Sequence, residues 1–285
     1  MARERSEISE IGYWSEVKLD IIRDYAGAYS RILTAQQKPN LHHVYIDAFS
    51  GAGFHKSRGT GALVWGSPTS VLLVDPPFKE YHFIDLDEGN IDVLEQQVRS
   101  RTQGPYDPDD VHFYNADCNK VLLSQVFPRV RFEDYRRALC LLDPYGLDLD
   151  WQVILAAGQA KSIEVFLNFP IMDINRNALW RDKDKVTAKQ RERLTRYWGD
   201  ESWRSAAYSS EGDLFGFEEK VTNEAVAEAF RQRLATVAGF SYVPAPMPMR
   251  NSKGAVVYYL FFASQNKAGA KIVQAIFDKY KDRSH

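Results

Sequence analysis

The sequence predicts an α/β protein with a Rossmann-like fold, built on a mostly parallel sheet of seven strands. Three observations lead to this prediction. An apolar run at residues 44–49 ends in the small-residue turn Ser50-Gly51-Ala52-Gly53. Three later apolar runs, separated by helical segments, each end in an acidic residue. Near the carboxyl terminus, two apolar runs flank a turn, which predicts that an antiparallel hairpin completes the sheet.

Composition limits what kind of protein this can be. The 285 residues carry a formal net charge of −2, and the sequence pI is about 6.3. The whole protein therefore does not attract polyanions, and any nucleic-acid contact must be local or made through a partner. Two cysteines, Cys118 and Cys140, are too few for a disulfide framework or a zinc site and are expected in the core.

The sequence shows no pattern typical of a signal peptide or of a membrane-spanning segment. Its first residues are polar without a following apolar segment of signal length, and no apolar run is long enough to span a bilayer. We expect a cytoplasmic protein with a single domain over residues 1–285. Within it, we expect an amino-terminal helical segment at about 8–36 and a helical, basic insertion at about 171–220.

The first strand and its turn predict a cofactor site. Gly51 and Gly53 let the backbone turn tightly and approach a ligand. Phe49 and Asp47 lie at the end of the strand, and a carboxylate there disfavours the pyrophosphate of a nicotinamide dinucleotide. It suits the ammonium and sulfonium groups of S-adenosylmethionine instead. Glycine turns after strands are common, so the motif alone is equally compatible with a purely structural turn.

An amphipathic helix, or two helices with a bend at Gly27, is predicted over residues 14–33. Trp14 and Lys18 are one helical turn apart, so Lys18 can meet the cofactor carboxylate while Trp14 packs beside it. The alternative is a solvated lysine next to a core tryptophan.

Residues 54–65 form a polar, glycine-rich loop between the glycine turn and the next helix, and we interpret this loop as a candidate lid over the substrate. Its candidate polar contacts are His55, Lys56 and Arg58. Ser67 followed by Pro68 predicts a helix start, with the serine as the N-cap residue. A merely flexible surface loop explains the segment equally well.

Two further strands end in acids that can bind the cofactor. Asp85 closes the strand at residues 81–87, where a carboxylate can accept both hydroxyls of a ribose. Asp87 is expected to cap the following helix. Asp117 closes the strand at residues 111–117 and is predicted to accept the adenine amino group, although it can equally cap the helix at 119–127.

The fourth strand, residues 138–146, ends in Asp143-Pro144-Tyr145-Gly146. These groups suit methylation of an amine on a planar substrate. Asp143 and the Pro144 carbonyl can accept hydrogen bonds from an exocyclic amine, and Tyr145 can stack on the ring. We therefore predict Asp143, Pro144 and Tyr145 as the catalytic residues.

The remaining elements complete the sheet. The fifth strand, at 161–170, brings Asn168, Phe169 and Pro170 to the substrate mouth, and residues 176–197 carry a basic excess that can contact phosphates or form a solvated helix face. Residues 202–216 are polar and expected to be mobile. The predicted carboxyl-terminal elements are a helix at 222–238, paired strands at 242–249 and 255–264, and a helix at 268–280.

Taken together, these motifs resemble class I S-adenosylmethionine-dependent methyltransferases, particularly those that methylate amino groups. The chain as a whole is similar to the three-Cys-motif partner protein family, on blocks that include residues 14–19, 45–49, 142–146, 164–170 and 258–264. The resemblance implies the methyltransferase fold, S-adenosylmethionine as cofactor and a partner protein that carries a three-cysteine motif. A nucleic acid or nucleotide-like molecule is the implied substrate class.

One departure from the amino-methyltransferase pattern bears on mechanism. The pattern has two prolines and then an aromatic residue after the acid or amide, whereas here Tyr145 occupies the second proline position and Gly146 the aromatic position. This motivates a second hypothesis, a non-catalytic or partner-activated subunit that binds the cofactor and recruits the three-cysteine protein. A nicotinamide oxidoreductase is a third, disfavoured by Asp47 and by the lack of a third glycine.

Overall fold

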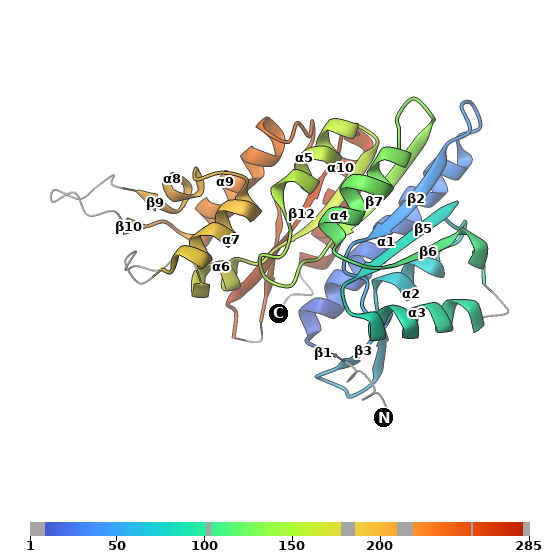
Figure 1. Ribbon diagram of the computed structural model, residues 1–285, viewed down its shortest axis with the longest axis horizontal. Coiled ribbons are helices and arrows are strands. Elements are labelled where there is room, and N and C mark those ends of the chain that lie inside the picture. The colour runs from blue at the N-terminus through green and yellow to red at the C-terminus, as the bar shows by residue number, and fades with distance from the viewer. Residues whose placement is uncertain (1–8, 101–103, 178–185, 210–218, 252, 282–285) are drawn as a thin grey trace.

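The computed structural model describes residues 9–100, 104–177, 186–209, 219–251 and 253–281. A seven-stranded sheet runs through the molecule in the order β11-β12-β8-β7-β2-β5-β6 (Figure 1). Its strands are β2 (His42–Asp47), β5 (Glu80–Asp85), β6 (Val111–Asn115), β7 (Arg136–Leu142), β8 (Ile163–Phe169), β11 (Met247–Arg250) and β12 (Val256–Ala263).

Six strands of this sheet run in one direction, and β12 runs in the opposite direction between β8 and β11. β6, β5, β2, β7 and β8 pair in parallel, while β12 is antiparallel to both β8 and β11. The chain order reverses between β2 and β7, so the carboxyl ends of these two strands border the crevice where open α/β sheets bind ligands. This is the Rossmann-like class I methyltransferase fold, and the prediction of a mostly parallel sheet with an antiparallel carboxyl-terminal hairpin is confirmed.

Helices cover both faces of the sheet, which explains why the central strands are almost continuously apolar. On one face, α1 (Tyr13–Ala35), α2 (Ser67–Leu72), α3 (Glu88–Ser100) and α10 (Lys267–Lys281) pack in one hydrophobic cluster. On the other, α4 (Cys118–Val121), α5 (Trp151–Ala160), α7 (Ala188–Trp198) and α9 (Asn223–Thr236) share a second cluster. Successive residues of β2 alternate between them, since Val44 and Ile46 lie in one and Tyr45 in the other.

Several predicted elements are confirmed with shifted ends. α1 is one continuous helix of 23 residues, so Gly27 does not divide it. Both cysteines are buried and free, as expected. The predicted helix at 119–127 is α4 followed by a π-helical turn, Leu122–Val126, and a 3-10 turn, Phe127–Arg129. A further 3-10 turn, Pro108–Asp110, precedes β6. Among the described residues, no helix is long and apolar enough to cross a membrane.

The segment at 54–65 is not the loop that the sequence predicts. It forms a hairpin of β3 (Phe54–Ser57) and β4 (Leu63–Trp65), and β1 (Glu10–Ile11) pairs with β3 in parallel to make a three-stranded sheet. This sheet forms through backbone pairing with an amino-terminal segment. The hairpin could not be predicted from the sequence, because its polar residues lack the apolar alternation that marks a strand. The predicted N-cap is also off by one residue, because Gly66 caps α2 and Ser67 is its first residue.

The predicted helical insertion follows β8. It contains α6 (Ile171–Asn177), α7 and α8 (Trp203–Ala207), with the short strands β9 (Tyr208–Ser209) and β10 (Glu219–Lys220), and it lies beyond β12 in Figure 1. α9 follows it and is the helix predicted at 222–238. The expectation of a mobile segment at 202–216 is wrong for its first part, because Trp203 and Ala207 of α8 are buried. α5, between β7 and β8, was not assigned from the sequence.

Candidate functional site

A polar cavity of about 260 Å³ opens at the carboxyl edge of the sheet, where β2 and β7 part. The loops that follow β2 and β7 line it, together with residues of α1, α2, β1, β3, β8 and β12. The lining residues are Ser9, Glu10, Ile11, Ser15, Lys18, Leu19, Phe49, Ser50, Gly51, His55, Ser67, Asp143, Pro144, Tyr145, Asn168 and Tyr258. The cavity thus lies at the topological switch point, where the fold is expected to bind ligands.

The cavity brings together six of the ten residues that the sequence singles out. These are Lys18, Phe49, Gly51, Asp143, Pro144 and Tyr145. The other four do not line it. They are Asp47, Gly53, Asp85 and Asp117. The three catalytic candidates therefore all line the cavity, whereas four of the seven cofactor candidates do not.

An ion pair between Lys18 and Asp143 occupies the centre of the cavity wall. The Lys18 ammonium contacts Asp143 Oδ2, and Asn168 Nδ2 donates to Asp143 Oδ1 at 2.8 Å. Side-chain exposure is 9% for Lys18 and 26% for Asp143, so the pair is only partly screened by water. The sequence suggested Lys18 for the cofactor carboxylate; in the structure its direct partner is the catalytic candidate.

The surroundings keep Lys18 charged. Burial by itself would lower the pKa of Lys18, but the attraction of Asp143, with smaller effects from Tyr258 and Asp47, outweighs it and raises this pKa. The ammonium also lies 5.4 Å from the centre of the Tyr258 ring, within the range of a cation–π interaction. A permanently charged lysine fixes the orientation of the Asp143 carboxylate.

Asp47 is completely buried and interacts electrostatically with both members of this pair. Its Oδ1 accepts the backbone N–H of Phe49 at 3.3 Å, and its Oδ2 accepts the Tyr45 hydroxyl at 3.4 Å. Burial, opposed by a hydrogen bond from Ser67 and by that from the Phe49 backbone, raises the pKa of Asp47 to about 7. A cationic ligand beside this carboxyl group would favour its ionised form.

Asp85, predicted to bind a ribose, holds the glycine turn in place. Its Oδ2 accepts the backbone N–H of Gly51 at 2.8 Å, and its Oδ1 accepts that of Asp87 at 2.8 Å. The carboxylate therefore joins the loops after β2 and β5. Asp87 accepts the backbone N–H of Asn90 at 3.0 Å at the start of α3, as expected for a capping residue. Ribose binding by Asp85 stays a prediction.

Asp117 has the capping geometry that the sequence left open. Its Oδ1 accepts the backbone N–H of Asn119 at 2.9 Å, and the side-chain amide of Asn119 also donates to this oxygen at 3.0 Å. Asp117 is thus the N-cap of α4. The predicted hydrogen bond from the adenine amino group to Asp117 stays a prediction, and Oδ2 is the oxygen that would accept it.

The two glycines of the turn serve different purposes. Both have positive φ, 60° at Gly51 and 83° at Gly53. A Cβ at Gly51 would meet no atom within 4 Å, whereas one at Gly53 would lie 2.7 Å from Leu94 and 2.9 Å from Thr69. Gly51 therefore keeps a cavity wall open, and Gly53 allows the turn to pack against α2 and α3.

Tyr145 stands at the rim with 69% of its surface exposed. Gly146, with φ of 63°, turns the chain directly after it. An exposed ring on a turn at the cavity mouth can stack on a planar ligand. The displaced aromatic residue of the motif is thus still placed at the site.

Several lining residues escaped the sequence analysis. Ser15 and Tyr258 lie in two of the blocks that carry the family resemblance, but no site role was predicted for them, and no local pattern marks Ser9. His55 was named as a lid contact and does line the cavity. Its Nδ1 lies 2.7 Å from the Ser9 hydroxyl, and burial, assisted by Lys18, lowers its pKa. Neutral His55 therefore faces the Lys18–Asp143 pair.

Within the part of the chain that the structure describes, two buried polar atoms of the lining have no hydrogen-bond partner. They are the Ser50 hydroxyl and Asn168 Oδ1. The Asn168 amide nitrogen must face Asp143 Oδ1, since two oxygens would repel each other, so its carbonyl oxygen is the free acceptor. Because an unpaired buried polar atom costs about 1–3 kcal/mol, both atoms are suited to a ligand with hydrogen-bonding groups. The site fits the ammonium and carboxylate end of S-adenosylmethionine.

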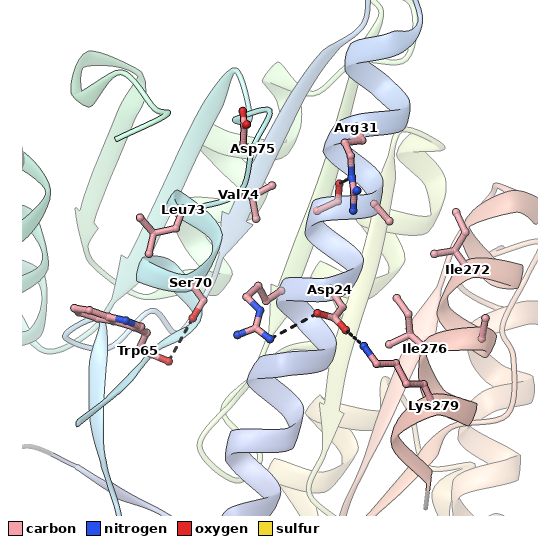
Figure 2. Close-up of a pocket in the computed structure, with 14 residues that line it drawn as sticks. Asp24, Arg31, Trp65, Ser70, Leu73, Val74, Asp75, Ile272, Ile276 and Lys279 are labelled. Carbon is pink, nitrogen blue, oxygen red and sulfur yellow. Dashed lines mark hydrogen bonds and ion pairs between the residues drawn. The ribbon is translucent and has the colours of Figure 1, made fainter. Parts of the chain in front are cut away.

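A larger hollow of about 810 Å³ lies elsewhere, between α1, α2 and α10. Figure 2 shows Trp65 and Leu73 on one side of this groove and Ile272, Ile276 and Lys279 on the other. Lys279 pairs with Asp24 at 2.7 Å. Of the buried polar atoms that have no hydrogen-bond partner among the described residues, none belongs to the lining of this groove, so size alone does not identify the site.

The basic insertion is only partly described. Arg181, Lys183 and Lys185 lie outside the described residues. In α7, Arg193 pairs with Asp148 at 3.0 Å and Arg196 with Asp150 at 2.8 Å. These two arginines link α7 to the segment between β7 and α5. Such ion pairs are compatible with the alternative that the basic residues form a solvated helix face.

Comparison with known proteins gives only distant likenesses. No family model matches the chain, and no curated protein matches it. Trm1 from Pyrococcus horikoshii, solved with S-adenosyl-L-methionine, is 11% identical, covers 92% of this chain and 57% of its own, and has a TM-score of 0.46. Magnesium protoporphyrin IX methyltransferase from Synechocystis, with bound cofactor, is 9% identical over 88% of this chain and 80% of its own, with a TM-score of 0.42.

The methyltransferase domain of a bacterial CtHen1 is 12% identical, covers 86% of this chain and 99% of its own, and has a TM-score of 0.41. The fold assignment rests on the strand order of the chain itself and not on these likenesses. Membership of the three-Cys-motif partner family stays a prediction from the motifs.

Proposed function

We propose that this protein is an S-adenosylmethionine-dependent methyltransferase that modifies a nitrogen of a nucleobase or nucleotide-like substrate. One observation carries the proposal. At the switch point of a methyltransferase-type sheet, an oriented carboxylate, Asp143, shares a cavity with the glycine turn that follows β2. The three-cysteine protein is the proposed partner, and this part rests on the motif resemblance.

The cavity residues divide into two groups by chemistry. Ser50, Gly51 and Phe49 would hold the methionine end of the cofactor, with the buried Asp47 carboxyl behind them. When bound, S-adenosylmethionine supplies a methyl group on a positively charged sulfur. An ionised Asp47 would stabilise positive charge in this part of the cavity.

The second group would orient the acceptor amine. Asp143 and the Pro144 carbonyl accept N–H hydrogen bonds, so the nitrogen lone pair points toward the methyl group. Lys18 and Asn168 keep the carboxylate in position. No strong base is needed, because an amine nitrogen becomes acidic once it is alkylated and then releases its proton to the carboxylate or to water.

A partner-activated subunit is the second candidate, and a specific observation favours it. Both oxygens of Asp143 already have partners within the chain, Lys18 and Asn168. If these contacts persist, the carboxylate is a structural group, and catalysis would need a rearrangement induced by another protein. Co-purification in a stable complex, with no methyl transfer by either protein alone, would favour this candidate.

The first test is calorimetric titration with S-adenosylhomocysteine. We expect a Kd in the micromolar range, about −8 kcal/mol. Ser50→Ala removes a hydroxyl that has no hydrogen-bond partner among the described residues, so it should weaken binding without lowering the melting temperature. Ser205→Ala, on α8, serves as the control. Absence of binding to the unaltered protein would contradict the proposal.

The second test is transfer of a labelled methyl group to adenine- and cytosine-containing oligonucleotides and nucleotides. Asp143→Ala should abolish transfer while cofactor binding persists. Retained turnover in this variant would exclude Asp143 as the acceptor-orienting residue.

A further inference from the structure

A second cavity, of about 580 Å³, lies at the opposite edge of the sheet. It is enclosed by the end of α1, the start of α10 and the first residues of β7 and β8, including Arg137 and Glu164. Because β7 and β8 are parallel, their starts and their ends lie at opposite edges, so this cavity is separate from the one that contains Asp143. Its volume falls within the usual range of small-molecule sites.

Two residues in the walls of this cavity adopt an unfavourable backbone conformation. Tyr135 has φ of 57° and Lys161 has φ of 58°. Among the described residues, they are the only non-glycine residues with positive φ, and both line this cavity. Glycine would adopt this conformation freely, whereas for another residue the conformation costs about 1–2 kcal/mol of folding free energy. Lys161 is the C-cap residue of α5, a position where this conformation is common. Tyr135 lies in the turn before β7, and an outlier of this kind at a cavity supports a hypothesis of function.

The side chains of the cavity are well suited to a flat ligand. Tyr29, Phe132 and Tyr135 contribute aromatic rings. Phe132 and Tyr135 remain 48% and 53% exposed. The Arg137 guanidinium lies 3.7 Å from the centre of the Phe132 ring, in a stacked arrangement that can extend to a planar group of a ligand.

The charges of the lining favour an anion. Among the described residues that line the cavity, the basic ones are Arg137, Lys161 and Lys267, and the only acidic one is Glu164. Glu164 is buried, and its oxygens accept hydrogen bonds from Tyr25 at 2.5 Å and Ser264 at 2.9 Å. Among the described residues, no carboxylate forms a salt bridge with any of the three basic side chains. Arg137 Nη1 donates to the backbone oxygens of Phe132 at 3.2 Å and Arg136 at 2.7 Å, which leaves its positive charge without a carboxylate partner among the described residues. The three cationic side chains can therefore pair with a phosphate.

We propose that this cavity binds a nucleoside monophosphate, with the base against Phe132 and Tyr135 and the phosphate between Arg137 and Lys161. The proposal does not depend on methyl transfer, since none of its residues lines the first cavity. α1 contacts both sites, because Lys18 lies in the first cavity and Tyr29 in the second.

The experiment is calorimetric titration with AMP, using the full chain in saturating S-adenosylhomocysteine so that the first cavity is filled. The key variants are Tyr135→Gly and Lys161→Gly, because glycine suits the backbone at both positions. We expect each to weaken AMP binding roughly tenfold, as loss of a stacking or charged contact does, with an equal or higher melting temperature. Adenosine and ribose 5-phosphate should each bind more weakly than AMP.

Three outcomes would overturn the proposal. The first is no AMP binding to the unaltered protein. The second is unchanged affinity in both glycine variants. The third is binding that Asp143→Ala abolishes and Lys161→Gly does not affect, which would place AMP in the first cavity. If S-adenosylhomocysteine itself does not bind, the proposed function fails, but the glycine variants still decide the fate of this second site.

Discussion

Replacing Asp47 by asparagine should change how the stability of the protein depends on pH. Burial raises the pKa of Asp47 from 3.8 to about 7. The folded protein therefore holds a proton on this group between about pH 4 and pH 7, where the unfolded chain has released it. Because the folded state binds more protons, its free energy of unfolding falls as the pH rises through this window.

The size of the effect follows from the shift. A difference of about three pKa units at 1.36 kcal/mol each corresponds to about 4 kcal/mol, to order of magnitude. Asparagine does not ionise, so the variant should lack this loss. The free energy of unfolding of the variant, minus that of the unaltered protein, should therefore increase steadily from pH 4.5 to pH 8. This trend is expected whatever the difference is at pH 4.5.

The assay is the melting temperature of both proteins across this pH range. Asp87→Asn is the matched control, because Asp87 is an exposed N-cap and asparagine caps helices equally well. The control should follow the pH profile of the unaltered protein. Parallel profiles for Asp47→Asn and the unaltered protein would refute the reasoning, because they would mean that Asp47 ionises alike in the folded and unfolded states.

Three further predictions follow from the site. Lys18→Met should lower the free energy of unfolding by about 2–3 kcal/mol, because Asp143 loses its counter-charge; an unchanged urea midpoint would contradict this. Gly53→Ala should destabilise the protein more than Gly51→Ala, which pays only for its backbone conformation, about 1 kcal/mol; equal melting temperatures would refute the close-packing argument. Asp117→Asn should retain the melting temperature and Asp117→Ala should lower it by a few degrees, in keeping with a cap worth about 1 kcal/mol.

Local sequence patterns were sufficient to predict the main sheet. Each strand is a short apolar run bounded by turn residues. The segments between the strands repeat their apolar residues with the period of a helix, which distinguishes them from strands. The same patterns placed Gly51 in a turn and Asp143 after a strand, so both reach the carboxyl edge of the sheet. The polar hairpin at 54–65 gave no such signal, since its strands exist only through their pairing with each other and with β1.

The sequence by itself therefore determined the fold class and the set of polar residues at one edge of the sheet, because these depend on interactions between near neighbours. Only the tertiary structure decided which of them act together. Lys18 meets Asp143 across 125 positions of sequence, and Asp85 holds the turn at Gly51 across 34. Such pairings depend on how α1 and the strands pack, and packing is a property of the whole core that no local pattern encodes.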